Sequence, residues 1–493
     1  MAERSDQASP GMIATGSVGH VPVMQARKHG GHGALDPVLM MLVVLLLAIG
    51  LTWIVPSGAF VRKNHNVVPG TFHVVPGTFH VVPKEIAPQY LIDSRPSSDE
   101  AAYPASILAL VTAQPAGMKQ SAGLIFMIMF LGGMFGILRA SGALEAAIDR
   151  LVAATGGRVA ILVPVLMVAI SAGSAFLGLI SEYLLIIPIM LALAARLGRS
   201  ALFGLAVVAV AAKIGYLASV ANPVALVIAQ PIVGVPVFSG WQLRIAIWVG
   251  LLALGVLYVL RLARREGSAA APAGHIAPAL QPRQLAIVIT LGLAVVAIVV
   301  GSTNYGWRDE AFGAFYIALG ALIATLAGMR PVAAAHAFID GMKGMMLAAL
   351  LVGMAAAVEI VLRDGRVLDT IINALSGLAS DKPPYLVGQA LMGIEMVLTV
   401  LIPSTSAKAA LSMPILAPIA QLNGVTGQTT VLAFLLGNGL MNMLSPTSGM
   451  LLAYLATGNV GYGAWARFIL PLWACLAVIC FIVIALAAAM GYA

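Results

Sequence analysis

The sequence predicts an all-α integral membrane protein with two homologous halves, each containing a re-entrant hairpin and a broken helix, and about 11–13 spans. Of its 493 residues, 60% are hydrophobic and 9% are charged, whereas a soluble domain carries about 25% charged residues. Many separate apolar runs have roughly the 17–25 residues that cross a bilayer as a helix. These observations exclude a soluble enzyme, a nucleic-acid-binding protein and an outer-membrane barrel, whose strands alternate apolar and polar residues.

The first apolar run lies between two polar segments. Residues 1–36 are rich in Gly and Ser and are expected to form a disordered cytoplasmic tail, and residues 37–120 hold the first span and a long polar loop. In this loop the heptapeptide VVPGTFH occurs at 67–73 and again at 74–80, which we interpret as a slippage duplication in an exposed loop. The net charge of +8 comes mainly from loops and tails, so it indicates topology rather than a ligand-binding surface.

Hydropathy predicts the order of the spans along the chain. They are expected at 38–56, 121–138, 159–177, 201–219, 225–238, 243–260, 285–301, 312–329, 344–362, 385–402, 427–444 and 466–490. Two shorter stretches, 182–195 and 407–420, each have a central proline, and their length is typical of re-entrant hairpins. Arginines at its start place the linker 262–283 in the cytoplasm, and residues 284–340 supply connecting spans.

Five sequence anchors recur at nearly one offset. They are Gly117-Met118-Lys119 with Gly341-Met342-Lys343, Leu138-Arg139 with Leu362-Arg363 and Trp241 with Trp465, all at 224, Pro188 with Pro414 at 226, and Pro223 with Pro446 at 223. This pattern predicts a duplication with halves at 121–261 and 341–490, the usual build of secondary transporters, whose site lies between the halves. Whether the halves are inverted stays open. Arg196 and Arg199 favour a first hairpin that opens to the cytoplasm, and the loop 421–428, without Lys or Arg, favours a second that opens outward.

Each half has a proline-containing break in an apolar stretch, at 218–223 and at 442–449. Proline removes an N–H and frees a carbonyl, and inside a membrane such groups must face protein, water or a ligand. The breaks therefore predict half-helix N-termini for an anion and carbonyls for a cation, with simple proline kinks as the alternative. The candidate substrate-binding residues here are Ser219, Asn222, Pro223, Ser445, Pro446 and Thr447.

The hairpins carry a second polar set. It comprises Ser181 and Glu182 in the first hairpin and Ser404, Thr405, Ser406 and Lys408 in the second. Small hydroxyl residues also permit close helix packing, which is the alternative explanation. We assign the second group to substrate binding, and Ser181, Glu182, Lys213, Asn438 and Asn442 to ion coupling.

Five charged residues lie inside apolar stretches: Glu182, Lys213, Glu359, Glu395 and Lys408. Each costs about 2.5–3.5 kcal/mol at the bilayer centre, so a functional role is the default interpretation. Lys213 and Lys408 would favour an anionic substrate if they face a cavity. The alternative is an internal ion pair, Glu182 with Lys213 or Glu395 with Lys408. Glu182 is the first candidate for a protonatable group.

Several of these segments are similar to those of a known family, the anaerobic C4-dicarboxylate carriers, and within it to the YfcC-like branch. The similar segments are TWIVPSGAF, LGGMFGILRASGALEAAI, ASVANPVALVIAQPIVGVPVFSGW, IPSTSAKAALSMPILAP and LSPTSGMLLAYL, and the resemblance covers about residues 38–490. It implies the fold of the ion-transporter superfamily, with a first substrate and cation cradle at Ser219, Asn222 and Pro223. The second cradle that it implies comprises Ser404, Ser406, Ser445, Pro446 and Thr447. The chain departs from the family pattern at Lys213, Glu395 and Lys408, where an ammonium could replace a sodium ion.

Together these features predict a secondary active transporter of a small carboxylate-bearing metabolite, a C4-dicarboxylate or similar organic anion, in the plasma (inner) membrane. The expected partners are this substrate, the lipid bilayer and a second copy in a homodimer, with no nucleic acid. No cofactor is expected beyond a coupling proton or sodium ion. The alternatives are an antiporter of amino acids, including basic ones, and a gated channel. An enzyme is not expected, because the sequence offers no nucleophile–base pair or metal cluster.

Overall fold

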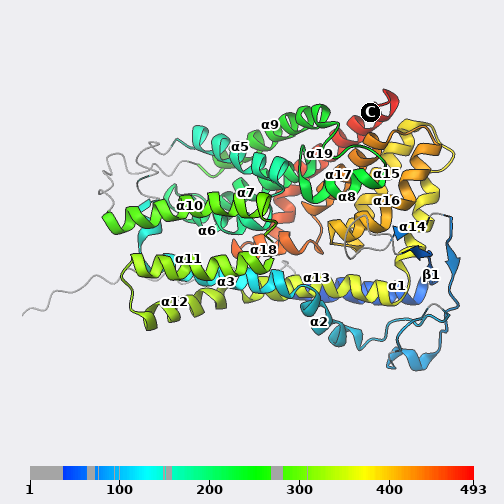
Figure 1. Cartoon of the computed structure of the whole chain (residues 1–493), viewed down its shortest axis with the longest axis horizontal. Helices are drawn as coiled ribbons and strands as arrows, with labels where there is room; N and C mark the ends of the chain where they lie inside the picture. Colours follow the sequence, from blue (N-terminus) through cyan, green and yellow to red (C-terminus); the bar gives the residue numbers. More distant parts are fainter. Residues whose placement is uncertain are drawn as a thin grey trace, which may run out of the picture. The chain divides into compact units, whose positions relative to one another are not determined.

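The computed structural model describes residues 37–63, 73–75, 77–93, 95–98, 100–147, 150, 158–267, 281–307 and 309–492. The expected tail at 1–36, most of the first VVPGTFH copy and most of the linker lie outside these residues. Eight helices within the described ranges are long and apolar enough to cross a membrane, with α7 and α8 counted together. The all-α membrane fold is therefore confirmed (Figure 1), and the total of 11–13 spans stays a prediction.

The elements follow one another as helices with one small β-region near the start of the chain. They are α1 (Pro37–Ile54), β1 (Gly58–Ala59), β2 (Arg62–Lys63), β3 (His73–Val74), β4 (His80–Val81), η1 (Pro88–Leu91), α2 (Ala109–Gln120), α3 (Ala122–Ala140), α5 (Val159–Leu177), η2 (Ser181–Leu184), α6 (Ile186–Arg196), α7 (Ala201–Ala218), α8 (Pro223–Ile232), α9 (Trp241–Arg265), α10 (Pro282–Asn304), α11 (Asp309–Leu326), α12 (Pro331–Gly344), α13 (Met346–Asp364), α14 (Leu368–Ser376), η3 (Gly377–Ala379), α15 (Pro384–Leu401), α16 (Thr405–Leu422), α17 (Gly427–Asn442), α18 (Gly449–Thr457) and α19 (Tyr462–Ala489).

Most expected spans match a helix to within a few residues, and 159–177 coincides with α5. The exception is the span expected at 225–238, because α8 ends at Ile232. The chain turns there at Gly234, whose φ of +76° is left-handed and suits glycine, which has no Cβ. The two short stretches expected as hairpins each follow directly on a longer helix. The hairpin of the first half thus consists of α5 with η2 and α6, and that of the second consists of α15 with α16.

Six elements of the first half have a counterpart in the same order in the second, while α14 and η3 have no described counterpart. The paired elements begin at 122 and 346 (α3, α13), 159 and 384 (α5, α15), 181 and 405 (η2, α16), 201 and 427 (α7, α17), 223 and 449 (α8, α18), and 241 and 462 (α9, α19). This agreement is what a duplication requires, although a common origin of the halves stays a prediction.

Glycines show how α2 and α3 lie against α12 and α13. A Cβ on Gly117 would meet the backbone of Gly353 and Ala357, and one on Gly136 would meet that of Ala337. From Gly117 to Gly136 the residue numbers rise, while the numbers of the residues that they contact fall from 357 to 337. The segment α2–α3 therefore runs antiparallel to the segment α12–α13. The sequence left the orientation of the halves open, and this pair favours the inverted arrangement. The pattern Gly132-x-x-x-Gly136 serves this close packing, as expected from its spacing.

The broken helices α7 and α17 are the most enclosed elements, since nearly every residue of each is buried. They pack against each other where a Cβ on Gly439 would overlap Leu217. Glycines of α7 also permit close contact with the first hairpin, because Gly204 lies against the Met190 carbonyl of α6 and Gly215 against the Ser171 carbonyl of α5. This packing places polar side chains of α7 and α17 in the interior.

The polar insertion at 57–104 is attached to the second half. Asp369 in α14 accepts from the Phe60 N–H at 3.0 Å and forms an ion pair with Arg62 at 2.8 Å. Ser57 donates to the Gly365 carbonyl at 2.8 Å, and Lys84 donates to the Thr52 carbonyl at the end of α1 at 2.6 Å. This loop is therefore a packed layer over α14 in its described part. The second VVPGTFH copy runs from β3 to β4.

Loops of the two halves meet at the two ends of α9. Arg199, which follows α6, donates to the Ala263 and Gly267 carbonyls at the end where α9 leads into the linker. At the other end Gln428 donates to Ser239, just before α9 begins. Arg199 and the loop 421–428 therefore lie at opposite ends of α9, as the charge pattern predicts for hairpins that open to opposite sides.

Candidate functional site

The first break separates α7 from α8 at four residues. The Ser219 backbone is left-handed, with φ +40°, a conformation that is uncommon outside glycine and often marks functional sites. In an unbroken helix the Val224 N–H would bond the Val220 carbonyl, but it donates instead to the Asn222 side chain at 2.9 Å. Asn222 thereby caps α8, with Pro223 as its first residue, as is typical of helix starts.

The second break lies between α17 and α18. Ser445 and Thr447 hydrogen-bond through their hydroxyls at 2.7 Å, and Pro446 lies between them. Ser448 accepts from the Leu451 N–H and so caps α18, while its own hydroxyl donates to Asn442 at 3.0 Å. Both breaks therefore begin a buried half-helix whose first N–H groups are only partly satisfied.

The final helix of each half supplies donors to the carbonyls that the breaks leave free. The Val220 carbonyl accepts from Arg244 of α9 at 3.0 and 3.2 Å. The Leu444 carbonyl accepts from Tyr462 at 2.5 Å, and the Met443 carbonyl accepts from Trp465 at 3.0 Å, both in α19. Protein donors thus occupy carbonyls that were expected to bind a cation, because a buried carbonyl needs a hydrogen-bond partner.

Each break is also hydrogen-bonded to the hairpin of its own half. The Ala221 N–H donates to the Ala175 carbonyl in α5 at 3.0 Å, and the Thr447 hydroxyl donates to the Val400 carbonyl in α15 at 2.8 Å. In each half, therefore, a bond joins the break to a carbonyl near the end of the preceding hairpin helix, through a backbone N–H in the first half and a side-chain hydroxyl in the second.

One tyrosine of each broken helix forms a hydrogen bond with the hairpin of the other half. Tyr454 in α18 donates to the Ile180 carbonyl in the first hairpin. Tyr216 in α7 hydrogen-bonds Thr405 at the start of the second hairpin's α16 at 2.5 Å and accepts from Asn438 of α17 at 3.0 Å. The candidate residues of both halves thus meet in the interior, and neither tyrosine was among the predicted site residues.

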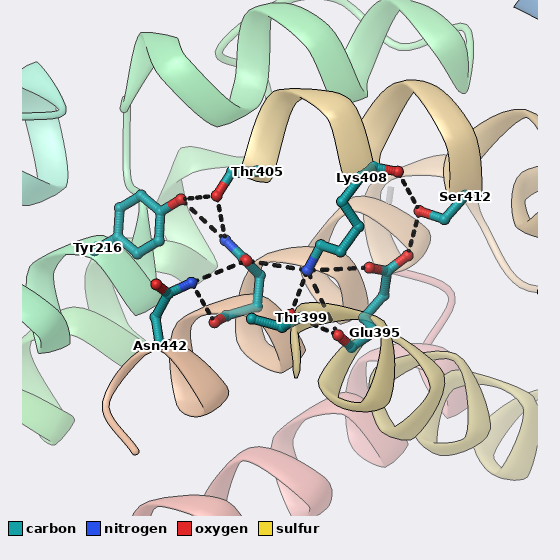
Figure 2. A network of polar contacts seen from close by, with 8 residues as sticks. Tyr216, Glu395, Thr399, Thr405, Lys408, Ser412 and Asn442 are labelled. Atoms are coloured by element: carbon teal, nitrogen blue, oxygen red, sulfur yellow. Dashed lines mark hydrogen bonds and ion pairs between the residues drawn. The ribbon is translucent and has the colours of Figure 1, made fainter. Parts of the chain in front are cut away.

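The second half contains a dense polar network around Lys408 (Figure 2). Lys408 is fully buried and forms an ion pair with Glu395 of α15 at 3.3 Å. Its ammonium also donates to Thr399 at 2.5 Å and to the Asn438 side-chain carbonyl at 3.0 Å. Asn442 donates in turn to Asn438 at 3.1 Å. The predicted alternative of a Glu395–Lys408 ion pair is therefore confirmed.

Lys213 has a different environment from Lys408. It is buried in α7, and its ammonium lies 5.8 Å from the centre of the Tyr454 ring. No carboxylate of the described residues lies within ion-pair distance of it, so the alternative pair of Glu182 with Lys213 is not formed. Glu182 accepts instead from the Ile180 N–H at 2.7 Å and from Ser181 at 3.2 Å. Tyr454 contacts Ile180 as well, so Lys213 and Glu182 approach one tyrosine from different elements.

The remaining hairpin residues act at the start of α16. Ser404 caps this helix by accepting from the Ala407 N–H at 3.3 Å, and it lies 3.4 Å from the Ser406 hydroxyl. Among the described residues, no group of three His, Cys, Asp or Glu side chains is placed to hold a metal. The predicted site residues thus offer hydroxyls, amides, helix N-termini and one ammonium that has no acidic partner among the described residues.

A cavity of about 910 Å³ lies next to this region. The insertion, α2, α13, α14 and α16 line it, and its charged lining includes Arg95, Arg363 and Glu359. Its wall reaches Ala407, which directly precedes Lys408. None of the residues assigned to substrate binding or ion coupling lines the cavity, whereas Glu359, one of the five charged residues in the apolar stretches, does.

Sequence analysis did not single out Arg244, which is almost fully buried at the start of α9. Besides Val220 it donates to the Ser239 carbonyl at 2.7 Å, and its Nη1 has no partner among the described side chains and backbone. Its position inside the expected span 243–260 could have identified it, because an arginine within a membrane span usually lines a substrate or ion pathway or makes a structural hydrogen bond.

This arrangement of broken helices and hairpins around a polar interior defines a multi-pass membrane transporter. The chain matches the C4-dicarboxylate anaerobic carrier (DcuC) family over residues 35–489, and it belongs to that family. This is a family of membrane transporters rather than of enzymes.

Two curated relatives have similar sequences. One, from Escherichia coli (strain K12), is named "Putative basic amino acid antiporter YfcC" and is 29% identical over 395 residues, 75% of this chain and 78% of the relative. An uncharacterized protein of Haemophilus influenzae is 24% identical over 482 residues, 88% of this chain and 93% of the relative.

Two solved structures of transporters also match. The Alcanivorax borkumensis YdaH transporter has a TM-score of 0.43 at 19% identity, with 92% of this chain and 99% of that chain covered. MtrF of Neisseria gonorrhoeae, described among antimetabolite efflux pumps, has a TM-score of 0.40 at 15% identity, with 93% and 96% covered.

Proposed function

We propose that this protein is a secondary active transporter of a small carboxylate-bearing metabolite, a C4-dicarboxylate or similar organic anion, in the plasma membrane. The observation that carries the proposal is the buried ammonium of Lys213, which has no acidic partner among the described residues. An uncompensated buried charge is costly, and a substrate carboxylate would supply the missing negative charge. Lys408 is not needed for this role, because its donors are engaged by Thr399, Asn438 and Glu395.

The breaks would complete the substrate site. Lys213 and Tyr216 lie on the same face of α7, since residues three apart in a helix are neighbours, and Ser219 follows directly after the end of this helix at Ala218. The N-termini of α8 and α18, capped by Asn222 and Ser448, carry partial positive charge that favours an anion. The carboxylate would therefore meet one ammonium and helix N-termini, with hydroxyls of the hairpins nearby.

During transport, the hairpin and the broken helix of each half would move together relative to the remaining helices. These remaining helices would also form the contact between the two copies of a homodimer. The bonds from Ala221 and Thr447 to the preceding helices support such joint movement. The cavity at the insertion would give access from one side once α16 moves. Glu182 is our first candidate for a group that takes up a coupling proton, with sodium as the other coupling ion.

The test is a thermal-shift panel of dicarboxylates, monocarboxylates and amino acids on the purified full-length protein, with and without sodium. Bound ligand stabilises the native state by mass action. We expect a dicarboxylate to raise the melting temperature of the wild type and of Lys343→Met, an exposed control on α12, but not of Lys213→Met. Equal stabilisation of Lys213→Met would rule out this lysine as the carboxylate ligand.

The second candidate function is exchange of amino acids, including basic ones. The name of the Escherichia coli relative suggests it, and the cavity offers both guanidinium and carboxylate groups, as a zwitterion requires. Stabilisation by arginine or ornithine, without any response to dicarboxylates, would favour this candidate. Counter-flow of labelled arginine in proteoliposomes would then separate exchange from net uptake.

A further inference from the structure

We propose that α15, α16 and α17 form a monovalent-cation site that the chain fills with its own Lys408 ammonium, so that no sodium ion binds there. The meaning of this site for coupling depends on the proposed transport function, but the site itself does not. It is formed by four oxygens from three residues, Glu395, Thr399 and Asn438.

The four oxygens surround the ammonium at hydrogen-bonding or ion-pair distances. Lys408 Nζ lies 2.5 Å from the Thr399 hydroxyl and 3.0 Å from Asn438 Oδ1. It lies 3.5 Å from the Glu395 main-chain carbonyl and 3.3 Å from Glu395 Oε2. An ammonium has three donors, so the fourth oxygen, Oε2, faces the charge without a hydrogen bond of its own.

The hydrogens of the surrounding groups are directed away from the ammonium. Thr399 donates its hydroxyl to the Glu395 main-chain carbonyl at 2.6 Å, and Asn438 donates its amide to Tyr216. Ser412 donates to the other carboxylate oxygen, Glu395 Oε1, at 2.7 Å. Only lone pairs therefore converge on Nζ, and such a set of oxygens suits any small cation.

With Glu395 ionised, the charges of this site balance only when a cation is present. Glu395 and Lys408 are both almost completely buried, and removal of one member of such a pair leaves a buried charge that is strongly unfavourable. The ring of Phe434, 5.0 Å from Nζ, adds a further surface that favours a cation. A variant without the ammonium would therefore bind a cation from solution if the space permits.

Lys213 provides an internal comparison. It is also a buried lysine, but it lies on the broken helix α7 rather than in a hairpin, and no carboxylate of the described structure lies within ion-pair distance of it. Loss of the Lys213 charge should therefore not create a cation site. The oxygens around Lys408, rather than the burial of a lysine, carry the inference.

The experiment compares melting temperatures of the purified full-length protein in sodium chloride and in choline chloride at constant ionic strength. We expect the wild type to show no saturable response to sodium that depends on Glu395. Lys408→Ala, which leaves both the space and the carboxylate, should gain a saturable rise in melting temperature with sodium. Lys408→Met, which fills the space, and the double variant Lys408→Ala/Glu395→Gln, which lacks the carboxylate, should not respond, and neither should Lys213→Met.

Two results would overturn the proposal. One is a saturable sodium response of the wild type that Glu395→Gln removes. The other is a Lys408→Ala protein that lacks the sodium response or does not fold in either salt while the double variant folds. Neither measurement involves a substrate, so a failure of the carboxylate proposal would leave this result intact, and the reverse is also true.

Discussion

The Lys213 ammonium lies over the Tyr454 ring, 5.8 Å from its centre, while the hydroxyl of the same tyrosine donates to the Ile180 carbonyl. One side chain of α18 therefore contacts α7 of the other half and the first hairpin together. A change in the position of Tyr454 would alter the contacts of both Lys213 and Glu182, because Ile180 also donates its N–H to Glu182.

The Tyr454 hydroxyl bond can be removed alone. Tyr454→Phe should lower the free energy of unfolding by about 0.5–1.5 kcal/mol, the net value of one hydrogen bond, and should slow uptake because hairpin and broken helix are no longer joined. The measurement is the melting temperature together with the initial rate in proteoliposomes. Tyr385→Phe, at an exposed position of α15, serves as the control. Unchanged uptake in Tyr454→Phe would contradict a coupling role.

The antiparallel contact between α3 and α12 leaves no space for a side chain at Gly136. Gly136→Val should prevent folding or strongly lower the yield of monodisperse protein, because the new atoms would overlap the Ala337 carbonyl. Gly393 of α15 has no neighbour within 4 Å of an added Cβ, so Gly393→Ala should be neutral or stabilising by about 0.5–1 kcal/mol. Size-exclusion profiles of the two variants test this; a normal profile for Gly136→Val would refute the close contact.

Asp369 attaches the insertion to α14 through Arg62 and the Phe60 N–H. Asp369→Asn should weaken this attachment and accelerate proteolytic cleavage within 57–104, with the membrane part intact. Asp93→Asn removes an exposed ion pair with Arg95, which is worth little, and should not change the cleavage rate. Equal cleavage rates for both variants would show that Asp369 does not hold the insertion.

Lys84 is expected to titrate near neutral pH. Burial lowers the pKa of Lys84 from 10.5 to about 8, because the charged form loses hydration. Between about pH 8 and 10.5 the folded state binds fewer protons than the unfolded state, so this lysine's contribution to stability should rise with pH in that window. Amine-reactive labelling followed by mass spectrometry should show half-maximal modification of Lys84 near pH 8. A midpoint near 10.5 would exclude the shift.

Local sequence patterns predicted the helices because span length and apolarity depend on neighbouring residues alone. The end of α8 was misplaced because Val233 and Val235 are both apolar, although they flank the left-handed turn at Gly234. The Glu395–Lys408 pair could be proposed because both residues belong to one hairpin. Tyr216 and Tyr454 could not be found in this way, because their partners lie on other elements 189 to 274 residues away. Arg244 also bonds another element, although its place inside an expected span was a signal.

The antiparallel packing of α2 and α3 on α12 and α13 has a consequence for the covalent chain. Because glycines of both segments bring the two backbones together along this contact, the halves recognise each other without the peptide that joins them. We expect that a gene divided within the linker, and expressed as two polypeptides ending at Gly267 and beginning at Gln281, would still yield an assembled carrier. The two polypeptides would then associate as a heterodimer.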